Sequence, residues 1–591
     1  VAQATAPPAP GQDWSPALTK ERLRQLQFKR SLIAPARQAR LNRQRAASGA
    51  MTRNAALSAP YGIAVAGSRS IPVLTGTYAN TPGNPYPVAN LQQELFDGPW
   101  PTGTMTEIYS DMSYGQLTVD GTVFNWVGNA ENDTFYEGPA GCNGLCNGAK
   151  VGEFLTEVLD QVDGSIDFGD YDNDGPDNIP NSGDDDGFVD FVAFVHPEAG
   201  GECGNNNVWS HRWVYSGWTG SEYVTDDNIQ GTITKIRIDD YVIQPAFACD
   251  GTTMIEIGVF AHEFGHAFGL PDLYDTDTSN GSSAGIGSWG LMASGSWGGD
   301  GNSPDRPSHM SAWAKEFLGW INPTTVTADQ MGAAIANVEQ NSFAYKLSID
   351  SNRYYLIANR QRIGFDDSLK SGGLAIWKIN DSVINAGLTS NTVNADENNQ
   401  GVELMEADGN NSLDNNVRSE AGDLFTVAGS DFDNSTTPAS SGNNAVCDIS
   451  APASTMTADL LVSTGTCNGQ IRLTLSLNPN TRLGLNDTAV LWATLRDPAN
   501  NPIAGETVSF ASADTSLATV SPSAVTNAAG VAQATVRGET RINNSTDINV
   551  TAAGASAQIL VKVPVFGGLH WSAVVFVALL LGWALRRRLF A

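Results

Sequence analysis

The apolar positions of this chain repeat with different periods in different parts of its length. Residues 150–162 place apolar side chains three and four positions apart, which predicts an amphipathic helix. Between 326 and 468, strand-like runs alternate with Asn and Asp turns and no helix-period run occurs, which predicts a β-sandwich-like accessory region. Four further segments are predicted to be strands: 71–75, 117–126, 187–196 and 233–243.

The C-terminal part shows two other patterns. Residues 469–563 contain short alternating runs separated by turn residues, which predict a separate β-sandwich. Residues 565–585 are an apolar run of 21 residues, long enough to cross the hydrocarbon core of a bilayer. Arginines at 586–588 follow, and positive charge favours the cytoplasmic side. We therefore expect a C-terminal transmembrane segment within 564–591, with the body of the protein outside.

The N-terminal part differs from the rest in charge. Residues 1–70 hold eleven Lys and Arg and two Asp and Glu, whereas the whole chain has a formal net charge of −30. The chain starts at Val1 with no apolar signal core, so we expect that a signal peptide has been removed. A basic segment before an acidic domain over 71–325 predicts a prosegment that shields that domain electrostatically. The alternative is a disordered leader with no inhibitory role.

Length, charge and cysteines narrow the class of protein. A chain of 591 residues contains several domains, because single cores rarely grow past about 250–300 residues. The acidic body argues against nucleic-acid binding, since phosphates would be repelled. Disulfides would indicate an exported protein, whereas six reduced thiols are the alternative. The spacing of the six cysteines favours three local pairs: Cys142 with Cys146, Cys203 with Cys249, and Cys447 with Cys467.

The candidate chemistry lies at residues 262–272, which read HEFGHAFGLPD. His262 and His266 are four positions apart, so on a helix both imidazoles can reach one metal ion. Glu263 then lies beside the metal and can take a proton from a water bound there. The helix is apolar around much of its circumference, which predicts burial. The alternative is a pair of core histidines hydrogen-bonded to backbone.

Several segments resemble one known family. HEFGHAFGLPDLYD at 262–275 resembles the zinc signature of the immune inhibitor A family of secreted bacterial metallopeptidases, which belongs to the wider metzincin-like group. WGLMASGSWGG at 289–299 resembles its methionine-turn segment, and PSHMSAWAKEFLGW at 307–320 resembles the stretch that follows. The likeness continues upstream at 104–120 and 167–174, and downstream at 354–361, 372–380 and 422–425, so it covers roughly residues 71–450.

The resemblance implies an α/β metzincin-like zinc endopeptidase. Its ligands would be His262, His266 and Asp272, its general base Glu263, and its methionine turn would contain Met292. Many metzincins have a third histidine where this chain has Asp272, but zinc accepts an aspartate oxygen. The other candidates for the third ligand are Asp275, Asp277 and the more distant Glu316.

Two further resemblances concern the C-terminal part. DPANNPIAGETVSF and TNAAGVAQATV, within 469–563, resemble a bacterial Ig-like domain of the invasin and intimin type, which implies a spacer. Gly567 and Gly568 before the apolar run resemble the glycine-glycine sorting tails of Gram-negative secreted proteins. Such a tail implies transient anchoring, cleavage by a sorting intramembrane protease, and a protein that is released or attached to the cell surface. A permanent anchor is the alternative.

Acidic clusters predict bound calcium. Asp170, Asp172 and Asp174, followed by glycine, match the opening of a calcium loop, and Asp190 could add a ligand. The twelfth position is Asn181 rather than glutamate, so the loop is not a complete EF-hand. A solvated acidic loop is the alternative. A second calcium could bind among residues 396–423, at Asp396, Glu403, Glu406, Asp408, Asp414 and Asp423.

The sequence as a whole predicts an exported zinc metallopeptidase that acts on protein or peptide substrates. The competing class is a surface adhesin or spacer protein with a vestigial zinc domain, but a degenerate site usually loses its base, and Glu263 is present. Hydrolysis of a non-peptide amide is a third possibility that the sequence does not separate from the first.

Overall fold

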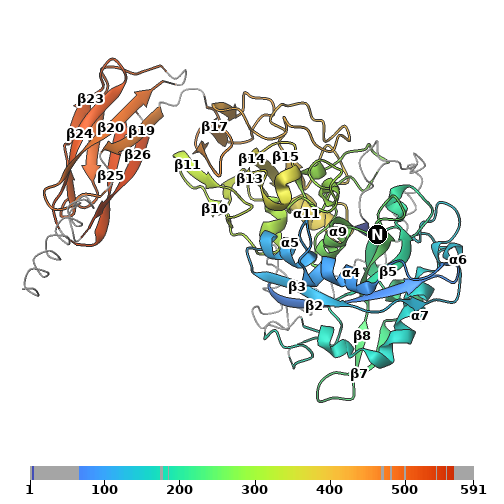
Figure 1. Cartoon of the computed structure of the whole chain (residues 1–591). Helices are drawn as coiled ribbons and strands as arrows, with labels where there is room; N and C mark the ends of the chain where they lie inside the picture. Colours follow the sequence, from blue (N-terminus) through green and yellow to red (C-terminus); the bar gives the residue numbers. More distant parts are fainter. Residues whose placement is uncertain are drawn as a thin grey trace, which may run out of the picture.

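Most of the regular structure of this protein is β-strand, arranged in separate sheets (Figure 1). The protein is therefore multidomain and mostly β, as the alternating apolar positions predict. The computed structural model describes residues 3–4, 65–173, 177–183, 185–277, 279–467, 472–478, 482–497, 501–540, 542–553 and 555–564.

The largest sheet has seven strands in the order β1-β6-β9-β5-β2-β3, with β4 paired to β2. Strands β2, β3, β5 and β9 are parallel to their neighbours, whereas β6 and β1 run antiparallel at one edge. The strands are β1 (Gln3–Ala4), β2 (Gly67–Thr77), β3 (Leu117–Val123), β4 (Val127–Gly128), β5 (Val192–Ala199), β6 (His211–Val214) and β9 (Asp240–Phe247).

Helices cover both faces of this sheet, because its central strands are apolar on both sides. On β5, Ala193 belongs to one hydrophobic core and Phe194 to another. The first core packs against α5 and α9, and the second against α7. The helices are α4 (Val88–Gln92), α5 (Met105–Met112), α6 (Asp133–Glu137), α7 (Val151–Val162), α8 (Ser216–Thr219), α9 (Ile257–Ala267), α10 (Ala312–Phe317) and α11 (Asp381–Gly387).

The predicted elements of this part are found with shifted ends. The helix over 150–162 is α7, and the strand over 71–75 lies within β2. The prediction for 187–196 began too early, because Gly187 has a φ of +82° and the regular strand starts only at Val192. The prediction for 233–243 was wrong in joining two strands: β8 (Lys235–Ile238) pairs in a hairpin with β7 (Tyr223–Asn228), and β9 follows.

Two sheets of the accessory region face each other across a third core, which gives a sandwich-like body. The region also contains α11, a short helix that the absence of a helix-period run did not predict. The first sheet contains β10 (Thr324–Thr325), β12 (Tyr345–Ser348), β13 (Arg353–Arg360), β14 (Gly373–Asn380) and β15 (Val402–Leu404). The second contains β11 (Gln330–Ala336), β16 (Ser430–Phe432), β17 (Ala445–Ile449) and β18 (Thr455–Leu461).

The seven-stranded sheet and the accessory region share the largest hydrophobic core. Its buried members include Trp297 and Met310 before residue 325, and Trp377 and Leu404 after it. Burial of each such side chain contributes on the order of 1.5–3 kcal/mol. The two parts therefore stabilise each other.

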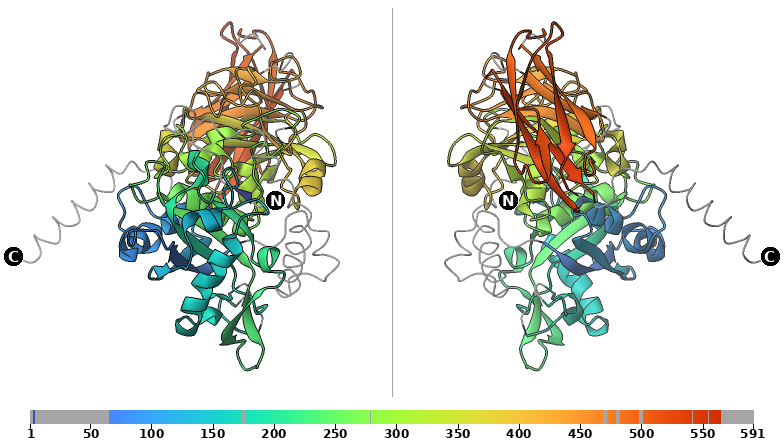
Figure 2. Two further views of the ribbon diagram at one scale, coloured as in Figure 1. Left: turned by 90° about the vertical axis from the view of Figure 1, so that its right-hand side faces the viewer. Right: turned by 90° about the vertical axis from the view of Figure 1, so that its left-hand side faces the viewer.

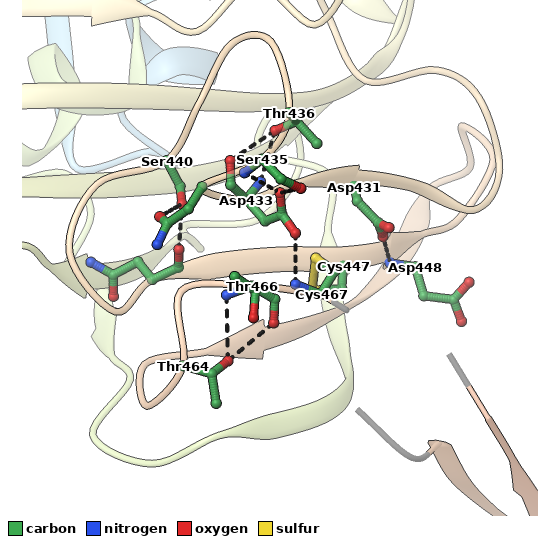
Figure 3. Close-up of a disulfide and its surroundings, with 12 residues drawn as sticks. Asp431, Asp433, Ser435, Thr436, Ser440, Cys447, Asp448, Thr464, Thr466 and Cys467 are labelled. Carbon is green, nitrogen blue, oxygen red and sulfur yellow. Dashed lines mark hydrogen bonds between the residues drawn. A yellow bond between two sulfur atoms is a disulfide. The ribbon is translucent and has the colours of Figure 1, made fainter. Parts of the chain in front are cut away.

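Disulfides join the three predicted cysteine pairs, Cys142–Cys146, Cys203–Cys249 and Cys447–Cys467. The last connects β17 to the chain that follows β18, where the Cys467 backbone N–H donates to Asp433 at 2.7 Å (Figure 3). Disulfides of this kind form in oxidising compartments.

The C-terminal sandwich is built from two four-stranded sheets around a core of its own. It lies at one end of the molecule, beyond the accessory sheets as seen from the seven-stranded sheet (Figures 1 and 2). Its strands are β19 (Arg472–Asn478), β20 (Thr488–Arg496), β21 (Thr507–Ser512), β22 (Ala518–Val520), β23 (Ser523–Val525), β24 (Val531–Gly538), β25 (Asn544–Ala552) and β26 (Ala555–Val563).

Two predicted segments fall outside the described residues. They are most of the prosegment over 1–70 and the apolar run over 565–585. Among the residues that the structure does describe, no helix has both the length and the apolar character needed to cross a bilayer.

Candidate metal centre

The two histidines of the motif lie one helical turn apart on α9, and neither is exposed to solvent. Their ring centroids are 4.6 Å apart. All residues from Ile257 to His266 are buried, because α9 packs between the seven-stranded sheet and the segments that follow the helix. The predicted burial of this helix is therefore found.

The hydrogen bonds of the two imidazoles fix which nitrogens are available. His262 Nδ1 donates to the Leu291 carbonyl at 2.8 Å, and His266 Nδ1 donates to the Leu270 carbonyl at 2.9 Å. A carbonyl oxygen can only accept, so each Nδ1 carries a proton, and Nε2 is the ring nitrogen of each histidine that can bind a metal ion. The two Nε2 atoms are 3.0 Å apart. Two ring nitrogens this close can share one metal ion.

Asp272 completes a triangle of donor atoms. The helix ends at Ala267, and Gly269, with a φ of +111°, then turns the chain back towards the histidines. Asp272 Oδ1 then lies 3.2 Å from His262 Nε2 and 3.1 Å from His266 Nε2. Ligand atoms of a tetrahedral zinc with bonds of about 2.0–2.1 Å lie about 3.3 Å apart. The three groups therefore fit one zinc ion.

The charge state of Asp272 suits this arrangement. Burial alone would raise the pKa of this carboxyl, but the two histidines beside it hold the pKa well below its ordinary value. Asp272 is therefore ionised at neutral pH, as a metal ligand must be.

Asn391 is a residue of this centre that the sequence did not reveal. Its side-chain Nδ2 donates to Asp272 Oδ2 at 2.6 Å, and its Oδ1 accepts the Asp272 backbone N–H at 2.8 Å. Both bonds span 119 positions of sequence, so no local pattern could have pointed to the pair. Asn391 thus holds the carboxylate of Asp272 in the orientation that faces the histidines.

We expect Asn391→Ala to weaken zinc binding by roughly 10–100-fold, the usual effect of losing a partner that orients a metal ligand. Competition with a chromogenic zinc chelator measures the change. Asn398→Ala is the matched control, because Asn398 is exposed on the same loop and, among the described residues, its N–H groups donate to Asp396. An unchanged zinc affinity in Asn391→Ala would show that Asp272 needs no such support.

Glu263 is fully buried and directly follows the first histidine. Burial raises the pKa of two neighbouring phenols, Tyr109 and Tyr274, well above the ordinary value, and the charge of Glu263 raises both further. Tyr274 also lies beside Asp272 and was not singled out from the sequence. Because its pKa is far above the ordinary value, the Tyr274 phenol stays neutral next to the two carboxylates.

Met292, the residue predicted for the methionine turn, is in contact with α9. A side chain at Gly265 would meet Met292 Sδ at 2.4 Å, so sulfur and helix backbone are in close contact. The Met292 carbonyl accepts the Leu273 N–H at 2.8 Å, which attaches the turn to the segment carrying Asp272. The turn therefore supports both the helix and the third donor.

Residues 94–321 match the immune inhibitor A peptidase M6 catalytic domain. The matched segment contains α9, Asp272 and Met292.

Two curated relatives agree with this match. Over 272 residues the chain is 30% identical to the pre-pro-metalloprotease PrtV of Vibrio cholerae serotype O1. This alignment covers 42% of this chain and 28% of PrtV. Over 257 residues it is 30% identical to immune inhibitor A of Bacillus thuringiensis subsp. alesti, with 39% and 35% covered. The chain thus matches about a third of the length of these relatives. The comparisons support a metallopeptidase.

A solved structure of the Yersinia pseudotuberculosis adhesin InvE is 29% identical to this chain where the two align. The aligned part covers 16% of this chain and 28% of the InvE chain, with a TM-score of 0.14. A TM-score this low gives no support to a common fold.

The other candidates for the third ligand have different partners. Asp275 accepts the backbone N–H groups of Asp277 and Ser283, and burial raises its pKa to about 6. Glu316 accepts from Lys346 at 3.0 Å and from Tyr354 at 3.2 Å. Neither carboxylate belongs to the group formed by the two histidines and Asp272.

The predicted calcium loop is only partly described, because Asp174 lies outside the described residues. Asp172 accepts the Gly187 N–H at 2.9 Å, Asp190 lies 3.5 Å from the Arg69 Nε, and Asp170 is exposed. Within the described ranges, none of these three belongs to a group of carboxylates close enough to share an ion. Calcium at this loop stays a prediction.

Proposed function

We propose that this protein is an exported zinc endopeptidase that hydrolyses peptide bonds of extracellular proteins. The observation that carries the proposal is the convergence of two histidine Nε2 atoms and one aspartate oxygen, 3.0–3.2 Å apart, in a buried site beside Glu263. The peptidase match over 94–321 supports the same activity, and the arrangement is consistent with a metzincin-like domain.

The residues of the centre divide the chemistry between them. Zinc, when bound, supplies a Lewis acid and lowers the pKa of a bound water to about 7. The Glu263 carboxylate accepts a proton from the attacking water and passes it to the leaving amine nitrogen. The bonds from His262 to Leu291 and from His266 to Leu270 hold the two imidazoles in place during this transfer.

The edge of the seven-stranded sheet at β6 supports the proposal that the substrate is a peptide. Strand β1 pairs antiparallel with β6, so that Gln3 lies opposite Arg212 and Ala4 opposite His211. Strand β6 would be the edge of the sheet without β1, and a free edge binds extended chain through backbone hydrogen bonds. We therefore propose that residues 1–70 act as a prosegment that occupies this edge until it is removed.

Export is supported by the three disulfides. We propose further that the C-terminal sandwich is an Ig-like spacer and that the apolar run over 565–585 anchors the protein transiently in the membrane of a Gram-negative cell. Structural calcium at Asp170, Asp172, Asp174 and Asp190 belongs to the same proposal.

The test is a terminal-amine proteomic comparison of secreted proteins incubated with the purified enzyme. New N-termini should appear with the enzyme, disappear after chelation and return when zinc is added. The Glu263→Ala variant should produce none of them. If no new N-termini depend on both the metal and Glu263, including after removal of residues 1–64, which precede β2, the protein is not an endopeptidase.

A further inference from the structure

Three carboxylates of the accessory region lie close together, and one of them bonds to Trp289, three residues before Met292. They belong to Glu406, Asp408 and Asp423, which follow β15 in the chain. Each offers one carboxylate oxygen, and these oxygens lie within 4.8 Å of one another. Glu406 and Asp423 are buried, whereas Asp408 is exposed at the rim of the cluster.

Asp423 is the informative member of this cluster. Its side chain has no exposure to solvent. Oδ2 accepts from Trp289 Nε1 at 2.7 Å and from the Glu420 backbone N–H at 2.9 Å. Oδ1, in contrast, is buried without any hydrogen-bond partner. A buried carboxylate oxygen left in this way costs free energy unless a cation binds it.

The charges around the cluster do not balance it. Among the described residues, no salt bridge from an arginine, lysine or histidine reaches any of the three carboxylates. Burial and the charges of Glu406 and Asp408 raise the pKa of Asp423 to about 6. At neutral pH the cluster therefore concentrates negative charge in a largely buried place.

We infer that Glu406, Asp408 and Asp423 bind one calcium ion. The donors are all carboxylate oxygens, which suit a hard cation rather than zinc or copper. Calcium accepts irregular shells of about 6–8 oxygens and can complete them with water at the exposed side, whereas magnesium demands a near-octahedral shell. This site is separate from the acidic loop over 170–190.

The ion would also act on the metal centre, because Asp423 bonds directly to Trp289. Two residues beyond Trp289, the Leu291 carbonyl accepts the Nδ1 proton of His262. The same part of the accessory region also holds the preceding segment, since the Ser288 N–H donates to the Arg418 carbonyl at 2.7 Å. Calcium at Asp423 thus fixes the position of the loop that orients a zinc ligand.

Calcium binding is measured on the full chain carrying Glu263→Ala, so that no proteolysis complicates it. The protein is freed of metals, reloaded with zinc and titrated with calcium chloride by isothermal titration calorimetry. We expect Asp408→Asn and Asp423→Asn each to remove one calcium or to weaken that site on the order of tenfold or more. Asp396→Asn, an exposed aspartate of the same region, is the matched control and should bind calcium as the parent does.

A second readout separates a calcium site from a merely structural cluster. The melting temperature of the parent should rise with calcium, and the rise should shrink in Asp408→Asn, whose exposed side chain can be changed without disturbing the core. Zinc affinity should also fall when calcium is withheld. This last result rests on the proposed zinc site, whereas the calorimetric result does not.

The inference is wrong if Asp408→Asn and Asp423→Asn keep the calcium number and affinity of the parent. It is also wrong if magnesium competes equally at the same concentration, because the site would then not be a calcium site. Should Asp423→Asn fail to fold, Asp408→Asn alone decides. Loss of calcium in Asp172→Asn but in neither cluster variant would assign all binding to the loop over 170–190.

Discussion

Replacing Glu263 with alanine is expected to lower kcat for peptide hydrolysis by about 10²–10⁴-fold while zinc remains bound. The carboxylate is buried next to His262 but is not one of the three donor groups, so its removal takes away the proton acceptor and leaves the ligands in place. Steady-state kinetics on a fluorogenic peptide substrate, together with metal analysis by mass spectrometry, measures both quantities.

The isosteric variant Glu263→Gln is the control for packing. It keeps the volume of the side chain but cannot accept the proton, so its activity should match that of the alanine variant. If either variant retains more than about a tenth of the parent activity with zinc bound, Glu263 is not the general base.

Replacing Asp272 with alanine is expected to weaken zinc binding by more than about 100-fold, because a direct ligand is lost. Loss of a residue that only orients a ligand weakens binding by roughly 10–100-fold. The two histidine Nε2 atoms would then share the ion with water alone. Zinc content after dialysis, measured by mass spectrometry, gives the result.

Asp275→Ala is the matched comparison. This aspartate lies on the same loop, but its carboxylate accepts backbone N–H groups from Asp277 and Ser283. Its zinc content should stay near that of the parent. Full occupancy in Asp272→Ala, with loss in Asp275→Ala or in Glu316→Ala, would transfer the third ligand to the other residue.

The local part of the metal centre could be predicted from the sequence. His262 and His266 are one helical turn apart, and the turn at Gly269 follows directly, so the relevant geometry is set within eleven residues. Asn391 could not be predicted, because its contact with Asp272 depends on how the accessory region packs against the peptidase part. Sequence spacing carries no information about a contact made by tertiary packing.

The acidic residues of the accessory region also show that sequence spacing does not predict contacts made by tertiary packing. Six acidic residues between 396 and 423 were candidates, and the fold brings three of them together. Glu403, for example, pairs with Lys378 at 2.7 Å instead. Alternation likewise predicted two β-sandwich regions, whereas α11 and the split between β8 and β9 depend on single turns that no period reveals.

The shared core of the peptidase part and the accessory region limits how such a chain can be rearranged. A cut near residue 325 would divide one hydrophobic core. It would expose Trp297 and Met310 on one fragment and Trp377 and Leu404 on the other. A cut between residues 467 and 472 would not, because the C-terminal sandwich buries its own core. Gene fusion and domain exchange should therefore tolerate a breakpoint between residues 467 and 472 but not one near residue 325. The peptidase part and the accessory region should be inherited together, whereas the C-terminal sandwich can be replaced.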